Sequence, residues 1–128
     1  MLYLDSSAVV KLVARQPETP ALVETLREDP QALSSALSWT EVTRAVRRAG
    51  GSARRAVSVL EGIALIPIDD GILRAAGTLA PSTLRTLDAI HLASALSVSD
   101  DLSAFVAYDV RLADAAAAME LRVLRPGA

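Results

Sequence analysis

The sequence predicts an α/β fold, a three-layer α/β/α sandwich built around a mainly parallel sheet of about five strands. Short apolar runs of strand length alternate along the chain with longer stretches in which apolar residues recur at helical spacing. One or two helices separate successive strands, and such connections join parallel strands by right-handed crossovers that cover both faces of a sheet. With 128 residues and 52% hydrophobic content, the chain suits one domain, which we expect to span residues 1–128.

The first quarter of the chain predicts two strands with two helices between them. The opening apolar run, residues 2–4, predicts a buried strand that ends at Asp5. Helical spacing of apolar residues then predicts helices over residues 6–15 and 18–28. A short, weakly apolar segment at residues 33–35 is interpreted as the second strand.

The middle of the chain is predicted to form two helices, separated by a glycine pair, and a strand. A helix that starts at Ser38 is expected to stop at Gly50, because paired glycines are a strong helix terminator. The next helix covers residues 52–61, with apolar side chains along one face. An apolar run over residues 63–68 predicts the third strand.

Helix-capping and helix-breaking residues mark the element boundaries in the last part of the chain. Asp69 or Asp70 is expected to cap a helix that runs to about Ala80, since aspartate side chains accept from free amides at helix starts. Pro81 marks a break before a long helix over residues 83–98. The remaining elements are a strand, a helix and a strand, over residues 104–108, 110–119 and 121–124.

Composition excludes several kinds of site. The chain has no cysteine, which excludes disulfides, thiolate metal sites and a cysteine nucleophile. With His91 as the single histidine, a multi-histidine zinc site within one chain is excluded too, so oxygen ligands remain for metal chemistry. No uncharged run exceeds 11 residues, and Asp5 interrupts the first apolar run. We therefore expect no membrane span, no secretory signal and a cytoplasmic location.

Two acids follow predicted strands directly. Asp5 comes after the first strand and Asp109 after the strand over residues 104–108. In open parallel sheets, ligands bind beyond the carboxyl ends of the strands, which makes both acids site candidates. Each acid also precedes a predicted helix, so helix capping is the alternative interpretation for either one alone.

Asp88 lies within the predicted helix over residues 83–98, on a stripe shared with Leu84 and Leu92. A carboxylate on an apolar stripe is costly to bury without a compensating charge or hydrogen bonds. A structural pairing, for instance with Arg85, would provide that compensation, and so would a metal cation. Taken together with the other acids, Asp88 is interpreted as a metal ligand.

Glu41 has a strong structural interpretation. Ser38 and Glu41 match the capping box, in which the serine caps the helix and the glutamate reaches back to its backbone amide. Arg44, three residues later, offers a second structural partner. Spacing alone therefore predicts a structural role for Glu41.

At these four acids the sequence resembles the PIN-domain ribonucleases, specifically the VapC-type toxins of bacterial toxin–antitoxin pairs. The similar segments are LYLDSSA around Asp5, WTEV around Glu41, LRTLDAIHLA around Asp88 and YDVRL around Asp109. They occur in the family's order and span essentially the whole chain. The third segment is fairly specific, and four segments in register make the resemblance strong.

The resemblance implies an endoribonuclease whose four acids hold Mg²⁺ or Mn²⁺, with Asp5 and Asp88 as primary ligands and Glu41 and Asp109 completing the cluster. Hard oxygen ligands suit these cations on chemical grounds as well. The resemblance also implies an RNA substrate, a small antitoxin that occludes the site, and a homodimer.

The sequence departs from the family pattern at Ala107, where family members often carry Thr or Ser two residues before the fourth acid. A catalytically weak binding module that acts through a protein partner therefore stays open as an alternative. A phosphatase forming an aspartyl-phosphate on Asp5 would usually have a second acid two residues later, where this chain has Ser7.

A run of arginines suggests where RNA binds. The net charge of −2 argues against a general nucleic-acid binder, but five arginines and no acid lie within residues 42–60. Arg44, Arg47 and Arg48 fall on one face of the helix that carries Glu41. We predict that this arginine stripe contacts RNA phosphates; a solvated helix face is the alternative.

Overall fold

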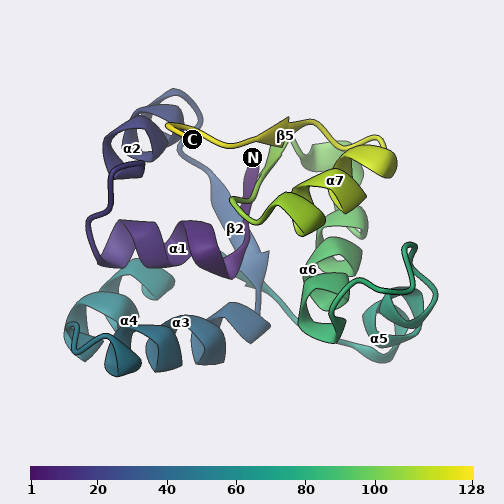
Figure 1. Ribbon diagram of the computed structural model, residues 1–128, viewed down its shortest axis with the longest axis horizontal. Coiled ribbons are helices and arrows are strands. Elements are labelled where there is room, and N and C mark those ends of the chain that lie inside the picture. Colours follow the sequence, from purple (N-terminus) through teal and green to yellow (C-terminus); the bar gives the residue numbers. More distant parts are fainter.

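The computed structural model describes all 128 residues and contains a five-stranded, fully parallel sheet in the order β3-β2-β1-β4-β5 (Figure 1). The strands are β1 (Leu2–Leu4), β2 (Ala32–Ser35), β3 (Ala64–Ile66), β4 (Ala104–Val106) and β5 (Val123–Leu124). The α-helices are α1 (Ser6–Val13), α2 (Thr19–Glu28), α3 (Leu37–Arg48), α4 (Ala53–Glu61), α5 (Asp70–Gly77), α6 (Thr86–Leu96) and α7 (Val110–Ala118). A single 3₁₀ turn, Ser99–Asp101, precedes β4. None of the helices is long and apolar enough to cross a membrane.

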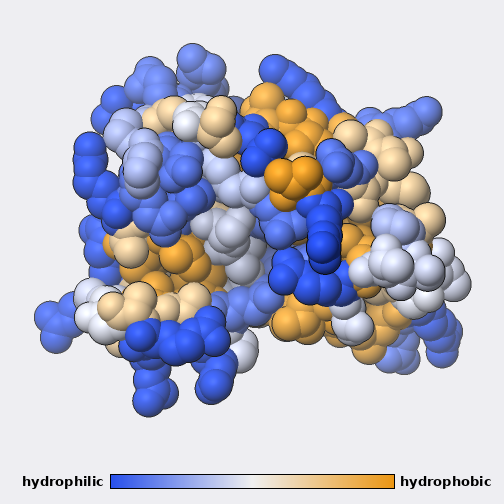
Figure 2. All heavy atoms as spheres, in the orientation of Figure 1, coloured by the Kyte–Doolittle hydropathy of each residue, from blue (hydrophilic) through white to orange (hydrophobic).

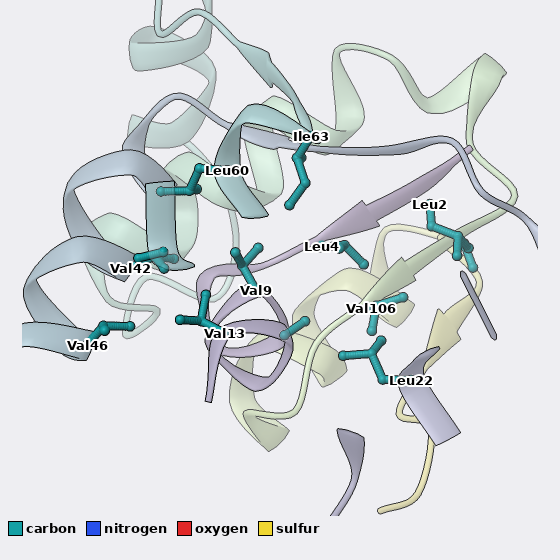
Figure 3. Close-up of a cluster of buried hydrophobic side chains, with 13 residues drawn as sticks. Leu2, Leu4, Val9, Val13, Leu22, Val42, Val46, Leu60, Ile63 and Val106 are labelled. Carbon is teal, nitrogen blue, oxygen red and sulfur yellow. The ribbon is translucent and has the colours of Figure 1, made fainter. Parts of the chain in front are cut away.

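Alternation along the strands builds the three layers. Leu2 and Leu4 point to one face of the sheet, where they join a core cluster with α1, α2, α3 and α4 (Figure 3). Tyr3 points to the other face and packs with Phe105 and with residues of α6 and α7. Figure 1 shows the same division, with α1–α4 on one side of the sheet and α5–α7 on the other. The predicted α/β/α sandwich is confirmed.

The strand order fixes where a ligand can enter. The chain adds β2 and β3 on one side of β1, then returns to add β4 and β5 on the other side. The carboxyl ends of β1 and β4 lie in register, with Leu4 paired to Val106. In parallel sheets the point where strand order reverses opens a crevice beyond these ends. The segments that follow β1 and β4 therefore line the crevice.

The element boundaries differ from the sequence prediction at several points, including the following three. The second strand is confirmed, but the third covers only Ala64–Ile66 instead of residues 63–68. The fourth ends at Val106 because its pairing with β1 and with β5 ends there. The long helix begins at Thr86, not near residue 83, since Arg85 has an extended backbone (φ −61°, ψ 145°). Asp88 consequently lies in the first turn of α6 and not deep inside a helix.

Candidate active site

Asp5 and Asp109 both occupy helix N-caps at the crevice. One oxygen of Asp5, Oδ1, accepts hydrogen bonds from the Ala8 amide (2.9 Å) and the Ser7 hydroxyl (2.7 Å). Asp109 Oδ1 accepts from the Leu112 amide at 3.1 Å. The capping interpretation is therefore confirmed for both acids. Capping uses only one oxygen of each carboxylate, so it does not exclude a second role.

The predicted capping box at Glu41 is wrong. Helix α3 begins one residue earlier than expected, with Ala36 at the cap position and no side-chain cap. The Ser38 hydroxyl lies 2.6 Å from the Ser34 hydroxyl, which in turn donates to the Leu4 carbonyl. Adjacent strands β1 and β2 bring these groups together. The Ser38 side chain therefore hydrogen-bonds to strand β2 and does not cap the helix. The Arg44 partnership is wrong as well, because Glu41 pairs elsewhere.

Glu41 is held by a hydrogen-bonded network that reaches across the sheet. His91 Nε2 lies 2.6 Å from Glu41 Oε1, and the Ser6 hydroxyl donates to the same oxygen. On the other side of the imidazole, Nδ1 lies 2.8 Å from the Tyr3 hydroxyl. The His91 residue is only 2% exposed. The Nε2 atom must carry the hydrogen in the bond to Glu41, since a carboxylate can only accept.

The electrostatics of this network keep Glu41 ionised and the Tyr3 phenol protonated. Partial burial works to raise the pKa of Glu41, but hydrogen bonds from His91 and Ser6 outweigh it, and the pKa lies below its usual value. Burial is also the main cause that raises the pKa of Tyr3 above its ordinary range. The network therefore fixes the orientation of a charged Glu41 carboxylate, whose second oxygen, Oε2, accepts no hydrogen bond from the protein.

Asp88 pairs with Arg85, as the structural alternative predicted. Arg85 Nε donates to Asp88 Oδ2 at 2.8 Å, and Arg85 Nη2 lies 3.4 Å from Asp109 Oδ2. A single guanidinium thus links the first turn of α6 to the start of α7. It also shows that Asp88 and Asp109, 21 residues apart in the sequence, lie on the same side of the crevice.

Asp5 is the most deeply buried of the four acids. It is 4% exposed, and burial raises the pKa of its carboxyl. Hydrogen bonds from Ser7 and Ala8 and the charge of His91 counteract this rise, while the negative charge of Asp88 adds to it. A buried acid that feels the charge of a second acid is stabilised in its ionised form by a nearby cation.

The donor chemistry fits a hard divalent ion, although no three acidic or imidazole groups converge on one point in the present side-chain arrangement. Each of three acids uses one oxygen for hydrogen bonds or ion pairs within the protein and leaves the other without a protein donor. These free atoms are Asp5 Oδ2, Glu41 Oε2 and Asp88 Oδ1. Carboxylate oxygens of this kind are the ligands that Mg²⁺ and Mn²⁺ take. The four-carboxylate metal site stays a prediction.

Sequence reasoning missed Ser6 and Tyr3 as parts of the site. The Ser6 hydroxyl contacts three partners at once: Glu41, His91 Nε2 at 3.0 Å and the Ser38 hydroxyl at 3.1 Å. The sequence feature that could have identified Ser6 is its position directly after Asp5, the acid at the end of the first strand. Nothing local pointed to Tyr3, because its partner His91 lies 88 residues away.

The arginine stripe lies on the outer surface of α3. Arg44, Arg47 and Arg48 are all exposed and together line a hollow of ≈ 300 Å³. On the opposite face of the helix, Val42 and Val46 are buried in the core. Trp39, in the first turn of the helix, is 40% exposed. Figure 2 shows strongly hydrophilic residues over this part of the molecule, below α3 and α4.

Comparison with known proteins agrees with this architecture. The PIN domain family model matches residues 2–118. Ribonuclease VapC46 of Mycobacterium tuberculosis is 46% identical over 98% of this chain and 97% of its own length. Ribonuclease VapC47 of the same species is 38% identical over 100% of this chain and 98% of its own. The chain belongs to the PIN-domain family. Within that family, its relatives place it among the VapC proteins.

Solved structures with low sequence identity share the fold. The sarcin-ricin-loop-cleaving toxin VapC20 of M. tuberculosis has a TM-score of 0.70 at 17% identity, covering 98% of this chain and 100% of its own. A toxin–antitoxin complex from Klebsiella pneumoniae contains a chain with a TM-score of 0.70 at 20% identity, covering 87% of this chain and 88% of that one. These likenesses support the fold independently of the family match.

Proposed function

We propose that this chain is a Mg²⁺- or Mn²⁺-dependent endoribonuclease, the toxin component of a type II toxin–antitoxin pair. The observation that carries the proposal is the placement of Asp5, Glu41, Asp88 and Asp109 at the crevice beyond β1 and β4. Three of these acids keep a carboxylate oxygen free of protein donors. The names of the curated relatives, which are ribonucleases, support the same activity.

The acids take different roles in this proposal. Asp5 and Asp88 would be the primary metal ligands, through the free oxygens Asp5 Oδ2 and Asp88 Oδ1. Glu41, held by His91 and Ser6, would offer its free oxygen Oε2 to the attacking water, and Asp109 would complete the cluster. A bound divalent ion would supply charge stabilisation at the phosphate and lower the pKa of water. The protein supplies the fixed orientation of the acids, which in-line attack on a phosphodiester requires.

We also propose an RNA substrate, a small antitoxin partner and a homodimer. One fold relative supports the antitoxin, since it comes from a structure described as a toxin–antitoxin complex. An antitoxin that covers the crevice would block the acids from RNA. Substrate and inhibitor would then compete for the same surface.

Cleavage of RNA by the purified chain, freed of any copurifying antitoxin, tests the function. We expect total RNA to be cut in the presence of Mg²⁺ or Mn²⁺ and to stay intact when a chelator is added. Cleavage that persists in chelator would contradict a metal-dependent site. RNA binding without cleavage under all conditions would favour the alternative of a binding module.

Ala107 is the specific feature that favours this alternative. Its side chain is fully buried in the core cluster with Tyr3 and Phe105, just after β4. A hydroxyl that could support the metal or its waters is therefore missing at this position. Ala107→Ser supplies the matched variant: a gain in cleavage rate at unchanged RNA affinity would show that Ala107 limits the activity.

The arginine stripe gives a prediction about RNA affinity. Changing Arg44, Arg47 or Arg48 singly to Gln should weaken binding to every RNA by a similar factor, because phosphate contacts carry no sequence information. Each change should flatten the dependence of log affinity on log salt by about 0.7 with single-stranded RNA. Turnover of bound RNA should change little. Fluorescence anisotropy over a salt series measures the slope.

Arg122→Gln is the matched control for the stripe. Arg122 is exposed and directly precedes β5, at the edge of the sheet opposite the crevice. The Arg122→Gln substitution removes the same charge as the stripe variants but should leave the slope of log affinity against log salt unchanged. A slope that stays fixed in all three stripe variants would assign the stripe to solvent or to a protein partner.

A further inference from the structure

We propose that Arg85 is an internal counter-charge of the acidic site that exchanges partners: it pairs with Asp88 and Asp109 in the metal-free protein and becomes a ligand of the RNA phosphate once a divalent cation binds these acids. The inference rests on the proposed function. It assigns a binding role to a residue outside the four acids.

The contacts place one guanidinium among several acids. Arg85 donates to Asp88 Oδ2 through Nε at 2.8 Å and reaches Asp109 Oδ2 through Nη2 at 3.4 Å. The hydrogen bond and charge of Asp88, then the charge of Asp109 and that of Glu41, all raise the pKa of Arg85. Three of the four site acids therefore act on the same cation.

Both oxygens of Asp109 already accept hydrogen bonds from the protein. Its Oδ1 accepts from the Leu112 amide and caps α7, so it is already engaged by the protein. Its Oδ2 is the oxygen that faces Arg85 Nη2. A cation that takes Asp109 through Oδ2, the oxygen not used to cap α7, meets the Arg85 guanidinium at the same atom. Arg85 and the cation compete for this atom.

The ion pairs of Arg85 can open at little cost to the fold. The Arg85 side chain is 65% exposed, and surface ion pairs contribute little to stability because solvent screens them. Arg85 occupies the cap position of α6 but its side chain makes no capping hydrogen bond. Losing the acids as partners thus disturbs neither the helix nor the core.

A displaced Arg85 remains anchored at the rim of the crevice with donors that match a phosphate. The guanidinium presents five N–H groups in a planar fork and cannot lose its charge. Bidentate binding of phosphate oxygens is the interaction that this geometry favours. The strand of RNA that approaches the acids must pass the rim, so its backbone is the anion within reach.

Two binding measurements on Arg85→Gln test the exchange without relying on activity. The first is Mn²⁺ affinity, from the signal of free Mn²⁺ in electron paramagnetic resonance. Removing the competing cation should tighten Mn²⁺ binding about three- to tenfold, since one unit charge and its ion pairs are lost next to the site. Arg85→Lys retains the charge and should stay near the parent, and Arg122→Gln should match the parent.

The second measurement is affinity for a single-stranded RNA oligonucleotide, with chelator and with Ca²⁺, which takes the same oxygen ligands. With chelator, Arg85 is held by the acids, and Arg85→Gln should bind RNA like the parent. With Ca²⁺, the variant should bind several-fold more weakly than the parent, with a salt slope lower by about 0.7. Electrophoresis verifies that the RNA stays intact.

The outcomes separate this inference from the proposed function. If the parent binds no Mn²⁺, the proposed function fails and the exchange fails with it. If the parent binds Mn²⁺ but Arg85→Gln binds it equally well, only the exchange is overturned. An effect of Arg85→Gln on RNA affinity that is the same with chelator and with Ca²⁺ overturns the exchange as well.

Discussion

Replacing Asp88 by Asn is expected to abolish metal-dependent RNA cleavage while leaving the fold intact. Removing a residue that merely orients a metal ligand typically lowers metal affinity or activity 10- to 100-fold. Loss of a direct ligand should therefore lower the cleavage rate at least about 100-fold. Asn has the same shape as Asp, and Asp88 lies in the first turn of α6, outside the core clusters. The measurement is the initial cleavage rate at saturating Mg²⁺.

The stability of the metal-free Asp88→Asn protein should stay within about 1 kcal/mol of the parent, because the lost ion pair involves the largely exposed Arg85. Removing the charge also lessens the repulsion that raises the pKa of Asp5. Chemical denaturation in chelator measures this difference.

Metal should then stabilise the two proteins differently. Mg²⁺ binds only the folded state and should raise the Tm of the parent with concentration, but barely that of Asp88→Asn. Asp100→Asn is the control, since Asp100 is exposed in the 3₁₀ turn before β4, at the edge of the sheet opposite the crevice. Equal Mg²⁺ stabilisation of parent and Asp88→Asn would remove Asp88 from the ligands.

The sequence predicted the sheet and its layers because those features follow local patterns. The apolar run at residues 2–4 and the helical spacing after it are readable within a few residues. Even the weak second strand was confirmed, since residues 33–35 are all buried in β2. Capping of α1 by Asp5 and of α7 by Asp109 was likewise readable, because a cap concerns only the next three residues.

The predictions that failed at the site concern contacts between residues far apart in the sequence. Ser38 and Glu41 match a capping box locally, but the real partners, Ser6, Ser34 and His91, come from other strands and helices. Which hydroxyl meets which acid depends on the pairing of β1 with β2 and on the packing of α6, and no spacing rule contains that information. The Asp88–Arg85 pair was predictable because it lies within three residues of the chain.

The second large effect is expected at Glu41. Glu41→Gln keeps the length and one carbonyl oxygen of the side chain, so hydrogen bonds from Ser6 and His91 can be preserved. The negative charge is lost, and with it the free charged oxygen, Oε2, that the proposed function assigns to the attacking water. RNA cleavage should fall about 10- to 100-fold, as for other groups that orient a metal site.

The cost to stability should be modest and dependent on pH. A hydrogen bond to a charged group contributes about 1 kcal/mol more than a neutral one, so the variant should be less stable by about that amount at neutral pH. The pKa of Glu41 is lower in the folded protein than its ordinary value of 4.5, so the carboxylate contributes stability above that value and loses it as the pH falls through the folded pKa. In metal-free buffer the difference between parent and variant should therefore shrink below pH 4.5.

His91 provides an internal reporter for this variant. It is the only histidine of the chain, so its ring nitrogen signals in NMR need no assignment among several residues. In Glu41→Gln the Nε2 signal should shift, because the hydrogen bond to a carboxylate becomes one to an amide, while Nδ1 keeps its contact with Tyr3. Glu61→Gln, at the exposed end of α4, is the control and should change neither the NMR signals nor the cleavage rate. Full activity in Glu41→Gln, together with the shifted Nε2 signal, would mean that the network around Glu41 is purely structural.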